Sequence, residues 1–359
     1  NNQIKDGDPR ESGTINYWRW KDQYLVRYLT FPPGEDYEAQ DEASRDPAIL
    51  LVHGFAASAE QWERLVYSLR EQRKESNGGK DTTPPIYAVD LLGFGHSEKP
   101  GLSYTQYLWE SQLVDFVVEV MEAVPMVMAG NSIGGGLSAG AAASLGREIC
   151  RGLVLLNTAG ILEDPASYDG YKNSDMEVYD NFNSYTDAAI EGNPDEAYKP
   201  VPLVGNKALD VFGSAIIGLI YPQIEKRLSL IYGNRIENAD PSVVYAIQQS
   251  AMHPGSANVI GSGQKLAPNR PLNEVLMGVG EEGDDGNSGF PTLVVMGLED
   301  QVSSPAAAQA RAELFCKLTP ETVTVEKIGD SGHCPHDETP EKVAKAMLKW
   351  FASSPLQGK

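Results

Sequence analysis

The pentapeptide Gly-Asn-Ser-Ile-Gly at residues 130–134 constrains the fold of this chain more than any other segment. An apolar run at residues 127–129 precedes it, and a run rich in small residues, 134–143, follows it. A strand, a sharp turn and a helix in this order form a nucleophile elbow, which holds a serine hydroxyl above the end of a sheet. Glycines let the backbone turn tightly and let the helix begin close to the strand. We therefore expect Ser132 to be a nucleophile, the alternative being a glycine turn that merely contains a serine.

A serine hydroxyl becomes a good nucleophile when a base takes its proton and a carboxylate orients that base. In hydrolases with this elbow the partners follow in the order Ser, Asp or Glu, then His. Asp300 ends the turn after an apolar strand pattern at residues 292–296. His333 ends a glycine-rich turn after a second strand pattern at residues 323–328. We assign Asp300 as the orienting acid and His333 as the base.

Neighbouring residues offer alternatives for both roles. Glu299 is the first alternative for the acid, and Asp330 is a third choice. His336 lies three residues after His333 and is the close competitor for the base. Asn157 also follows a strand pattern, but an amide cannot supply the negative charge that an orienting acid needs.

The oxyanion that forms during acyl transfer needs two backbone N–H donors. We expect the first from Ile133, because the residue after the nucleophile supplies one donor in this arrangement. We expect the second from Phe55, which follows His53 and Gly54 in the turn after a strand pattern at residues 49–52. The other interpretation is that His53 and Gly54 only tighten that turn.

Short apolar strand patterns alternate with helical patterns along the chain, which is typical of an α/β fold with a mainly parallel sheet. The predicted strands are an N-terminal antiparallel hairpin at 15–20 and 24–29, then 49–52, 86–90, 127–130, 153–156, 292–296 and 323–328. The predicted helices run from a capping-box pattern at Ser58 to about residue 73, over 106–123 and over about 340–351.

The interval from Leu156 to Thr292 is far longer than the roughly 30 residues that a βαβ unit needs. We therefore predict a first part of the core over residues 1–157, an inserted and mainly helical cap over 158–290, and a second part of the core over 291–359. The inserted part includes an acidic, tyrosine-rich segment (163–197), an apolar helix pattern (211–221) and a loop rich in glycine and acidic residues (280–286).

The apolar helix pattern in the predicted cap has two interpretations. Phe212, Ile216 and Ile220 are candidates for the lining of an apolar substrate tunnel. Packing inside the cap is the other interpretation, because a helix that is apolar on most faces is usually buried. We name these three residues as the expected substrate-binding residues.

Composition excludes several classes of partner and site. The chain has 29 basic and 50 acidic residues and a formal charge of -21, which argues against nucleic acid or an anionic membrane as the main partner. Its three cysteines are too few and too scattered for a disulfide framework, and no metal-binding spacing occurs. No apolar run reaches the roughly 18 residues of a membrane-spanning helix. We expect no metal, no other cofactor and no membrane span.

In combination, these motifs resemble those of the α/β-hydrolase superfamily over about residues 14–352. The motifs are His53-Gly54, the turn Asp90-x-x-Gly93-x-Gly95-x-Ser97, the elbow at 130–135 and Gly332-His333. The resemblance implies the α/β-hydrolase fold, with a mostly parallel sheet, an N-terminal antiparallel hairpin and an inserted helical cap. It also implies that Ser132, Asp300 and His333 form a catalytic triad.

Finer details resemble the plastid and cyanobacterial branch that contains pheophytinase and chlorophyll dephytylase. They are Trp18-x-Trp20, His53-Gly54-Phe55 with Trp62, residues 88–95, Leu108-Trp109 with Gln112-Leu113, Gly130-Asn131-Ser132 and residues 332–338. This branch implies hydrolysis of the phytyl ester of a chlorophyll-type pigment through an acyl-enzyme. It also implies a plastid location, and since the sequence begins at Asn1 rather than Met, we expect any targeting peptide to be absent from it.

Three other functions fit the same motifs. A Gly-Asn-Ser-x-Gly-Gly elbow also occurs in hydrolases that cleave carbon–carbon bonds of ring-fission products, and a lipid acyl hydrolase is a further alternative. A ligand receptor on a hydrolase scaffold can also keep an intact triad. Dehalogenases and epoxide hydrolases of this fold need aspartate at the elbow, so Ser132 excludes them. In the preferred interpretation the partner is an apolar small-molecule ester substrate. We expect this substrate to be a pigment that comes from a membrane.

Overall fold

The computed structural model describes residues 10–168, 184–193, 195–203, 206–233, 241–262, 271–277, 289–318, 322–353 and 356. Part of the acidic, tyrosine-rich segment, residues 169–183 and 194, lies outside these ranges. The predicted glycine-rich loop at 280–286 lies outside them as well.

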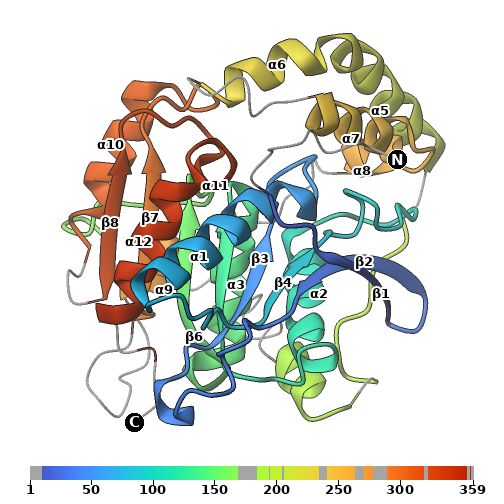
Figure 1. Ribbon diagram of the computed structural model, residues 1–359. Helices are drawn as coiled ribbons and strands as arrows, with labels where there is room; N and C mark the ends of the chain where they lie inside the picture. The colour runs from blue at the N-terminus through green and yellow to red at the C-terminus, as the bar shows by residue number, and fades with distance from the viewer. Residues whose placement is uncertain are drawn as a thin grey trace.

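A single eight-stranded sheet, in the order β1-β2-β4-β3-β5-β6-β7-β8, forms the centre of the described molecule (Figure 1). β1 pairs antiparallel with β2, β2 pairs antiparallel with β4, and the remaining neighbours are parallel. The predicted mainly parallel sheet with an N-terminal hairpin is therefore confirmed. The strands are β1 (Thr14–Trp20), β2 (Tyr24–Phe31), β3 (Ala48–Val52), β4 (Ile86–Val89), β5 (Met126–Asn131), β6 (Cys150–Leu156), β7 (Thr292–Gly297) and β8 (Val323–Ile328).

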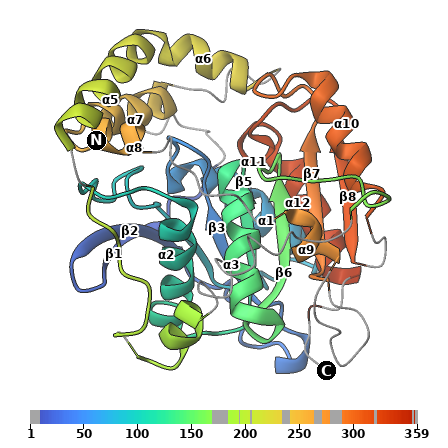
Figure 2. The same cartoon turned by 180° about the vertical axis from the view of Figure 1, so that it is seen from behind.

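Helices cover both faces of the sheet. Figure 1 shows α1 (Glu63–Ser76) and α12 (Pro340–Ser353) in front of it. Figure 2 shows α2 (Gln106–Glu119) and α3 (Ile133–Ile149) in front of the opposite face, and α10 (Pro305–Phe315) packs its buried side on that same face.

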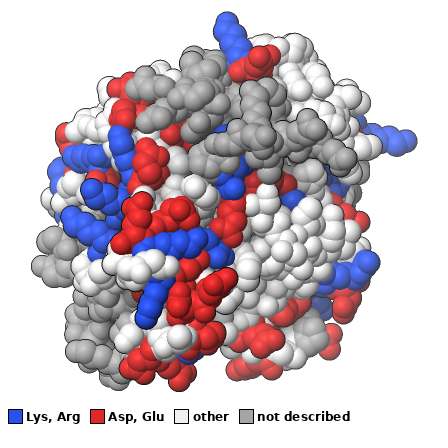
Figure 3. Space-filling model, in the orientation of Figure 1, with Lys and Arg blue, Asp and Glu red and all other residues white. Residues whose placement is uncertain are grey.

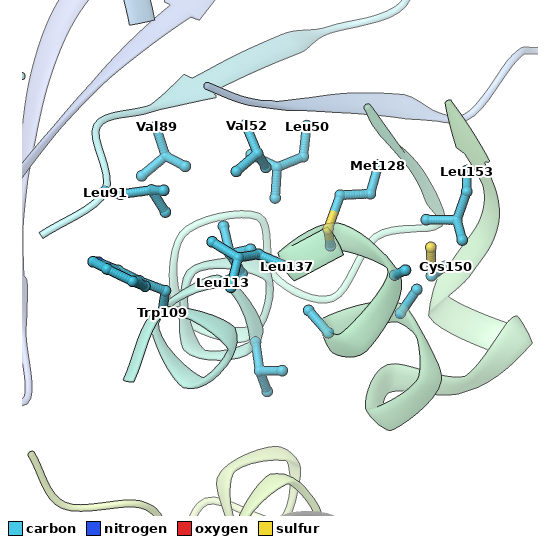
Figure 4. Close-up of a cluster of buried hydrophobic side chains, with 14 of the residues drawn as sticks. Leu50, Val52, Val89, Leu91, Trp109, Leu113, Met128, Leu137, Cys150 and Leu153 are labelled. Carbon is cyan, nitrogen blue, oxygen red and sulfur yellow. The ribbon is translucent and has the colours of Figure 1, made fainter. Parts of the chain in front are cut away.

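The two faces are separated by the alternation of side chains along each strand. In β3, Leu50 and Val52 belong to the hydrophobic cluster that includes α2 and α3, whereas Ile49 and Leu51 belong to the one that includes α1 and α12. Figure 4 shows part of the first cluster, with Leu50 and Val52 directed toward Leu113. All five residues of β3 are buried, as expected for a parallel strand covered on both faces.

The predicted capping box at Ser58 is wrong. Ser58 makes no side-chain capping bond to the short helix η2 (Ala59–Trp62), which leads into α1. Instead, the Asp90 carboxylate accepts the Ala59 N–H at 2.7 Å from the turn after β4. The same carboxylate accepts the His96 N–H at 2.8 Å and an Arg27 N–H at 3.1 Å. Asp90 therefore connects two turns beside the elbow, which is a structural role.

The segment between β6 and β7 is mainly helical where it is described. It includes a helical stretch at 184–190, α5 (Asn206–Ile220), η3 (Tyr221–Gln223), α6 (Ile224–Ile231), α7 (Pro241–Met252), α8 (Ser256–Ser262) and α9 (Leu272–Met277). Figures 1 and 2 both show α5 to α8 as a layer above the carboxyl ends of the strands. α9 lies apart from this layer in both figures, and its Leu272, Val275 and Leu276 join the core cluster that includes α3.

Two shorter helices complete the described fold: η1 (Glu42–Ser44) precedes β3, and α11 (Pro335–Glu338) follows the predicted base. Within the described ranges, each helix is too short or too polar to cross a bilayer.

Candidate active site

Ser132 lies between β5 and α3 in a backbone conformation that serine rarely adopts. Its φ of 55° and ψ of -122° place it in a strained region, which persists only where the surrounding structure holds it. Gly134 makes this turn feasible, because a Cβ atom there would lie 2.4 Å from the Val52 carbonyl oxygen of β3. The predicted strand–turn–helix arrangement is therefore present around Ser132.

Asp300 and His333 approach each other across the ends of β7 and β8. The Asp300 Oδ2 atom lies 2.9 Å from Nδ1 of His333. A histidine that donates from Nδ1 to a carboxylate has Nε2 free to accept a proton. Asp300 is buried, whereas the His333 side chain keeps 13% of its surface exposed. The pair has the orientation that a carboxylate and a general base require.

Hydrogen bonds keep the Asp300 carboxylate ionised despite its burial. Burial raises its pKa, but the hydrogen bond and the charge of His333, with donors from Asn157 and Val302, outweigh this effect and hold the pKa below its usual value. Val302 N–H donates to Oδ1 at 2.7 Å, and the Ser303 hydroxyl donates to Oδ2 at 3.2 Å.

Asn157 is a supporting residue that the sequence analysis did not assign to the site. Its amide donates to Asp300 Oδ2 at 3.1 Å and to the Gly297 carbonyl at 3.0 Å, and its oxygen accepts the Gly297 N–H at 2.7 Å. It therefore fixes the end of β7 and the carboxylate together. Its position after β6, at the same sheet edge as the elbow, is the sequence signal that points to it.

The alternative acids and the alternative base lie in other environments. Asp330 forms an exposed ion pair with Lys342, and Glu299 is only partly buried, whereas Asp300 is the carboxylate that bonds to His333. His336 is fully buried with its ring 4.1 Å from that of Trp62, and burial lowers its pKa to about 3. A fully buried ring with a pKa this low is a poor candidate for the base.

His53 forms a hydrogen bond to the peptide unit that contains the N–H of Phe55, a predicted oxyanion donor. Leu91 N–H donates to Nε2 of His53 at 3.0 Å, so Nδ1 carries the ring proton and donates to the Gly54 carbonyl at 2.7 Å. Burial also lowers the pKa of His53, which keeps the ring neutral. Because N–H and C=O of a peptide point in opposite directions, the Phe55 N–H points away from His53.

The two predicted oxyanion donors lie beside the nucleophile. A Cβ atom on Gly54 would lie 3.2 Å from Cβ of Ser132, so the turn that contains Phe55 adjoins the elbow. Ile133 begins α3, where the first N–H groups have no partner within the helix. Their role as oxyanion donors stays a prediction.

Two apolar hollows meet at Phe55. The first, about 830 Å³ including its open mouth, lies among α2, α3 and α9, and it contains Ile133 and Glu110 in its wall. The second, about 590 Å³ including its mouth, lies beneath α5, α7 and α8. The residues common to both walls are Phe55, Phe94 and Val259.

The structure separates the three predicted substrate-binding residues. Ile216 and Ile220 line the second hollow, together with Ile217. Phe212 is not among the lining residues of either hollow, and 49% of its surface is exposed. The reason is that α5 is apolar on most of its circumference, so its inward face cannot be identified from the pattern of apolar residues.

The described walls of both hollows contain no lysine or arginine. Among the residues that the structure describes, no group of three or more His, Cys, Asp or Glu side chains has a metal-binding arrangement. On the outer face in Figure 3, acidic and basic side chains are intermingled. The described walls of the two hollows are therefore mainly apolar, with Glu110 as their one carboxylate.

The family comparison agrees with the geometry. The sequence pattern of the Alpha/beta hydrolase family matches residues 49–346, which is most of the chain. Among individual proteins, Lipase 3 of a Moraxella species is 25% identical over 347 residues, which cover 92% of this chain and 85% of that lipase.

Two other comparisons cover different shares of the chain. The 2-hydroxy-6-oxo-6-(2'-aminophenyl)hexa-2,4-dienoic acid hydrolase of Metapseudomonas resinovorans is 30% identical over 124 residues, or 34% of this chain and 39% of that enzyme. A thermophilic esterase from Thermogutta terrifontis superposes with a TM-score of 0.57 at 18% identity and covers 97% of this chain and 100% of its own. At this identity the superposition supports the fold alone.

Proposed function

Because this chain belongs to the alpha/beta hydrolase family, we propose that it is a serine hydrolase that cleaves apolar carboxylic esters through an acyl-enzyme. The observation behind this proposal is the Asp300–His333 hydrogen bond of 2.9 Å at the sheet edge where Ser132 occupies its strained turn. This arrangement contains each residue type that serine-dependent acyl transfer needs, in the chain order expected for an elbow hydrolase.

In the proposed reaction, Nε2 of His333 takes the proton of the Ser132 hydroxyl as the oxygen attacks the ester carbonyl. The Phe55 and Ile133 N–H groups stabilise the resulting oxyanion. His333 then gives its proton to the leaving alcohol, and a water molecule activated by the same histidine releases the acid. Asp300 stays ionised throughout and stabilises the protonated imidazole.

For the substrate, we propose an ester with a long apolar group, and specifically the phytyl ester of a chlorophyll-type pigment. The support is the apolar wall of the two adjoining hollows and the resemblance to the pheophytinase and dephytylase branch. A branched prenyl-type alcohol would gain about 0.8 kcal/mol for each CH₂ group that it buries in such a wall. A plastid location is part of the same proposal.

Carbon–carbon bond hydrolysis is the second candidate, since one relative is a hydrolase of a dienoic acid. Such a substrate carries a carboxylate, and burying an anion without a cationic partner is costly. The described walls provide no lysine or arginine for it. We therefore favour the ester.

Four substrates offered in parallel test this proposal: a phytylated pigment, a short acyl ester, a lysolipid and a dienone ring-fission product. Release of phytol by the wild type, with a Ser132→Ala control that releases none, is the expected result. Cleavage of the dienone in preference to all esters would contradict the ester proposal. Tight retention of a ligand with negligible turnover of all four would favour a receptor.

A further inference from the structure

The loop that contains His333 is bound on both sides by one buried carboxylate. Glu338, on α11, accepts the Gly332 N–H on Oε2 at 2.8 Å and the Cys334 N–H on Oε1 at 2.9 Å. Its residue surface is only 1% exposed. Since the two oxygens of one rigid group bind the residues before and after His333, they fix the backbone from which the imidazole projects.

The backbone of His333 itself is bound by two other elements. Its N–H donates to the Ile231 carbonyl at 3.0 Å, at the end of α6. Its carbonyl accepts the Asn131 amide at 2.9 Å, one residue before the nucleophile. Glu338 completes this set, because it supplies the acceptors for the neighbouring N–H groups.

The double acceptance requires the ionised form of Glu338. A carboxylate accepts on both oxygens, whereas a protonated carboxyl has an O–H that faces one of the two N–H donors and loses that bond. Burial raises the pKa of Glu338 to about 7, although the Gly332 and Cys334 N–H groups oppose this effect. Among the described residues, the ionisable groups around it include Asp337 and Cys334 of the same turn and His333. Asp337 in turn contacts Tyr232 after α6 and Arg64 of α1.

We propose that Glu338 is a positioning residue, whose carboxylate holds the His333 loop in the geometry that activates Ser132. This inference rests on the base role of His333 in the proposed function. Glu338 acts through the backbone of its neighbours Gly332 and Cys334. It is the last residue of the segment 332–338 and takes no direct part in the catalytic steps.

The test is the rate at which a small fluorophosphonate labels Ser132, which requires no knowledge of the natural substrate. Glu338→Gln keeps the size of the side chain but places an amide NH₂ group opposite one N–H donor. We expect labelling at pH 8 to slow by about 10- to 100-fold, as for other small misplacements of a catalytic group. Glu326→Gln, which changes an exposed residue of β8, is the matched control and should label at the wild-type rate.

The pH profile distinguishes positioning from a general loss of structure. In the wild type, lowering the pH through about 7 protonates Glu338 and removes one of its two backbone bonds. The wild-type rate should therefore fall more steeply in this range than the rate of Glu338→Gln, which has no carboxyl group at this position to protonate. A loss of structure alone would lower the rate without changing this steepness.

Glu338→Asp keeps the charge on a shorter side chain. It should recover part of the rate and keep the steep profile, and it replaces the Gln variant if that variant does not fold. Equal rates and equal steepness in wild type and Glu338→Gln, or a Glu338→Asp profile that loses its steepness, would overturn the proposal while the proposed function stands. A wild-type chain that the probe does not label at Ser132 would refute the proposed function itself.

Discussion

The two sides of the site differ in the kind of interaction that forms them. The side of the sheet includes the loops after its strands and α11. Here Asp300, Asp337 and Glu338 are at most 3% exposed, and each carboxylate has hydrogen-bond donors at defined positions. On the side of the helices, α5 contributes isoleucines to an apolar wall and exposes Val211 and Leu219 to solvent.

This difference separates the residues that carry out the proposed chemistry from those that select the substrate. Hydrogen bonds to charged groups depend on distance and angle, so the sheet side permits one arrangement. Apolar burial has no preferred direction, so the helix side can accommodate side chains and ligands of several shapes. Substitutions on the sheet side should therefore change turnover for every substrate, whereas those on the helix side should change the dependence on chain length.

Ser132→Ala should give the largest effect on the sheet side. We expect turnover to fall by about 10⁶, because only substrate binding and the oxyanion donors then contribute to catalysis. Fluorophosphonate labelling should disappear in the variant. Ser144→Ala removes another hydroxyl of α3, one that bonds to the Gly140 carbonyl, and it should label normally. Labelling that persists in Ser132→Ala would reject the assignment of the nucleophile.

Asp300→Asn should lower turnover by about 10⁴, because an amide neither orients the correct tautomer of His333 nor stabilises its protonated form. Glu299→Gln changes the adjacent carboxylate and should cost far less. Initial rates on one short ester measure both variants. The reverse ranking would move the acid to Glu299.

Asn157→Gly should lower turnover by about tenfold for short and long esters alike, since it removes one donor to Asp300. Glycine suits this position, where φ is 39°. Asn258→Ala, on α8, removes a buried amide of the helix side and is the matched control. A loss confined to long esters in Asn157→Gly would contradict the division between the two sides.

Ile216→Asp should raise KM for long-chain esters by about tenfold and leave short acyl esters nearly unchanged, because a charge in the second hollow opposes burial of a long chain. Leu219→Asp lies on the same helix with 70% of its surface exposed and should have little effect. Phe212→Asp should resemble Leu219→Asp. Equal impairment of short and long esters by Ile216→Asp would show that the residue serves packing.

The smallest expected effect concerns stability. Burial, with the nearby charge of Glu60, raises the pKa of Glu63 on α1 to about 7. A raised pKa means that its contribution to stability is complete below about pH 4.5 and is lost as pH rises through about 7. The Tm of the wild type, relative to that of Glu63→Gln, should therefore fall by a few degrees between pH 5 and pH 8. A constant difference across this range would contradict the prediction.

The sequence predicts the parts of this site that depend on local patterns. The strands before Ser132, Asp300 and His333 are short runs rich in apolar residues, and each of the three residues lies in the turn that follows its strand. Parallel strands place their carboxyl ends at one edge of a sheet, so the order of the motifs already brings these turns together.

Other features depend on contacts between distant segments, which no local pattern encodes. Ser58 has the sequence of a capping residue, yet the N–H of Ala59 is bound by Asp90 from another turn. Asn157 looked unsuited to the site because it has no charge, but it acts as a donor to the acid. Phe212 lies outside both hollows, and the mostly apolar sequence of α5 does not show which of its apolar residues face inward.

The bond between the Asn131 amide and the His333 carbonyl joins residues that are 202 positions apart in the chain. Chains fold from the N-terminal side during synthesis, and contacts between distant segments form slowly. Ser132 is therefore synthesised long before β8 and the loop that contains His333. Under the proposed mechanism, the newly made chain has a serine but no base to activate it until β8 has joined the sheet, so hydrolytic activity would begin only when folding is nearly complete.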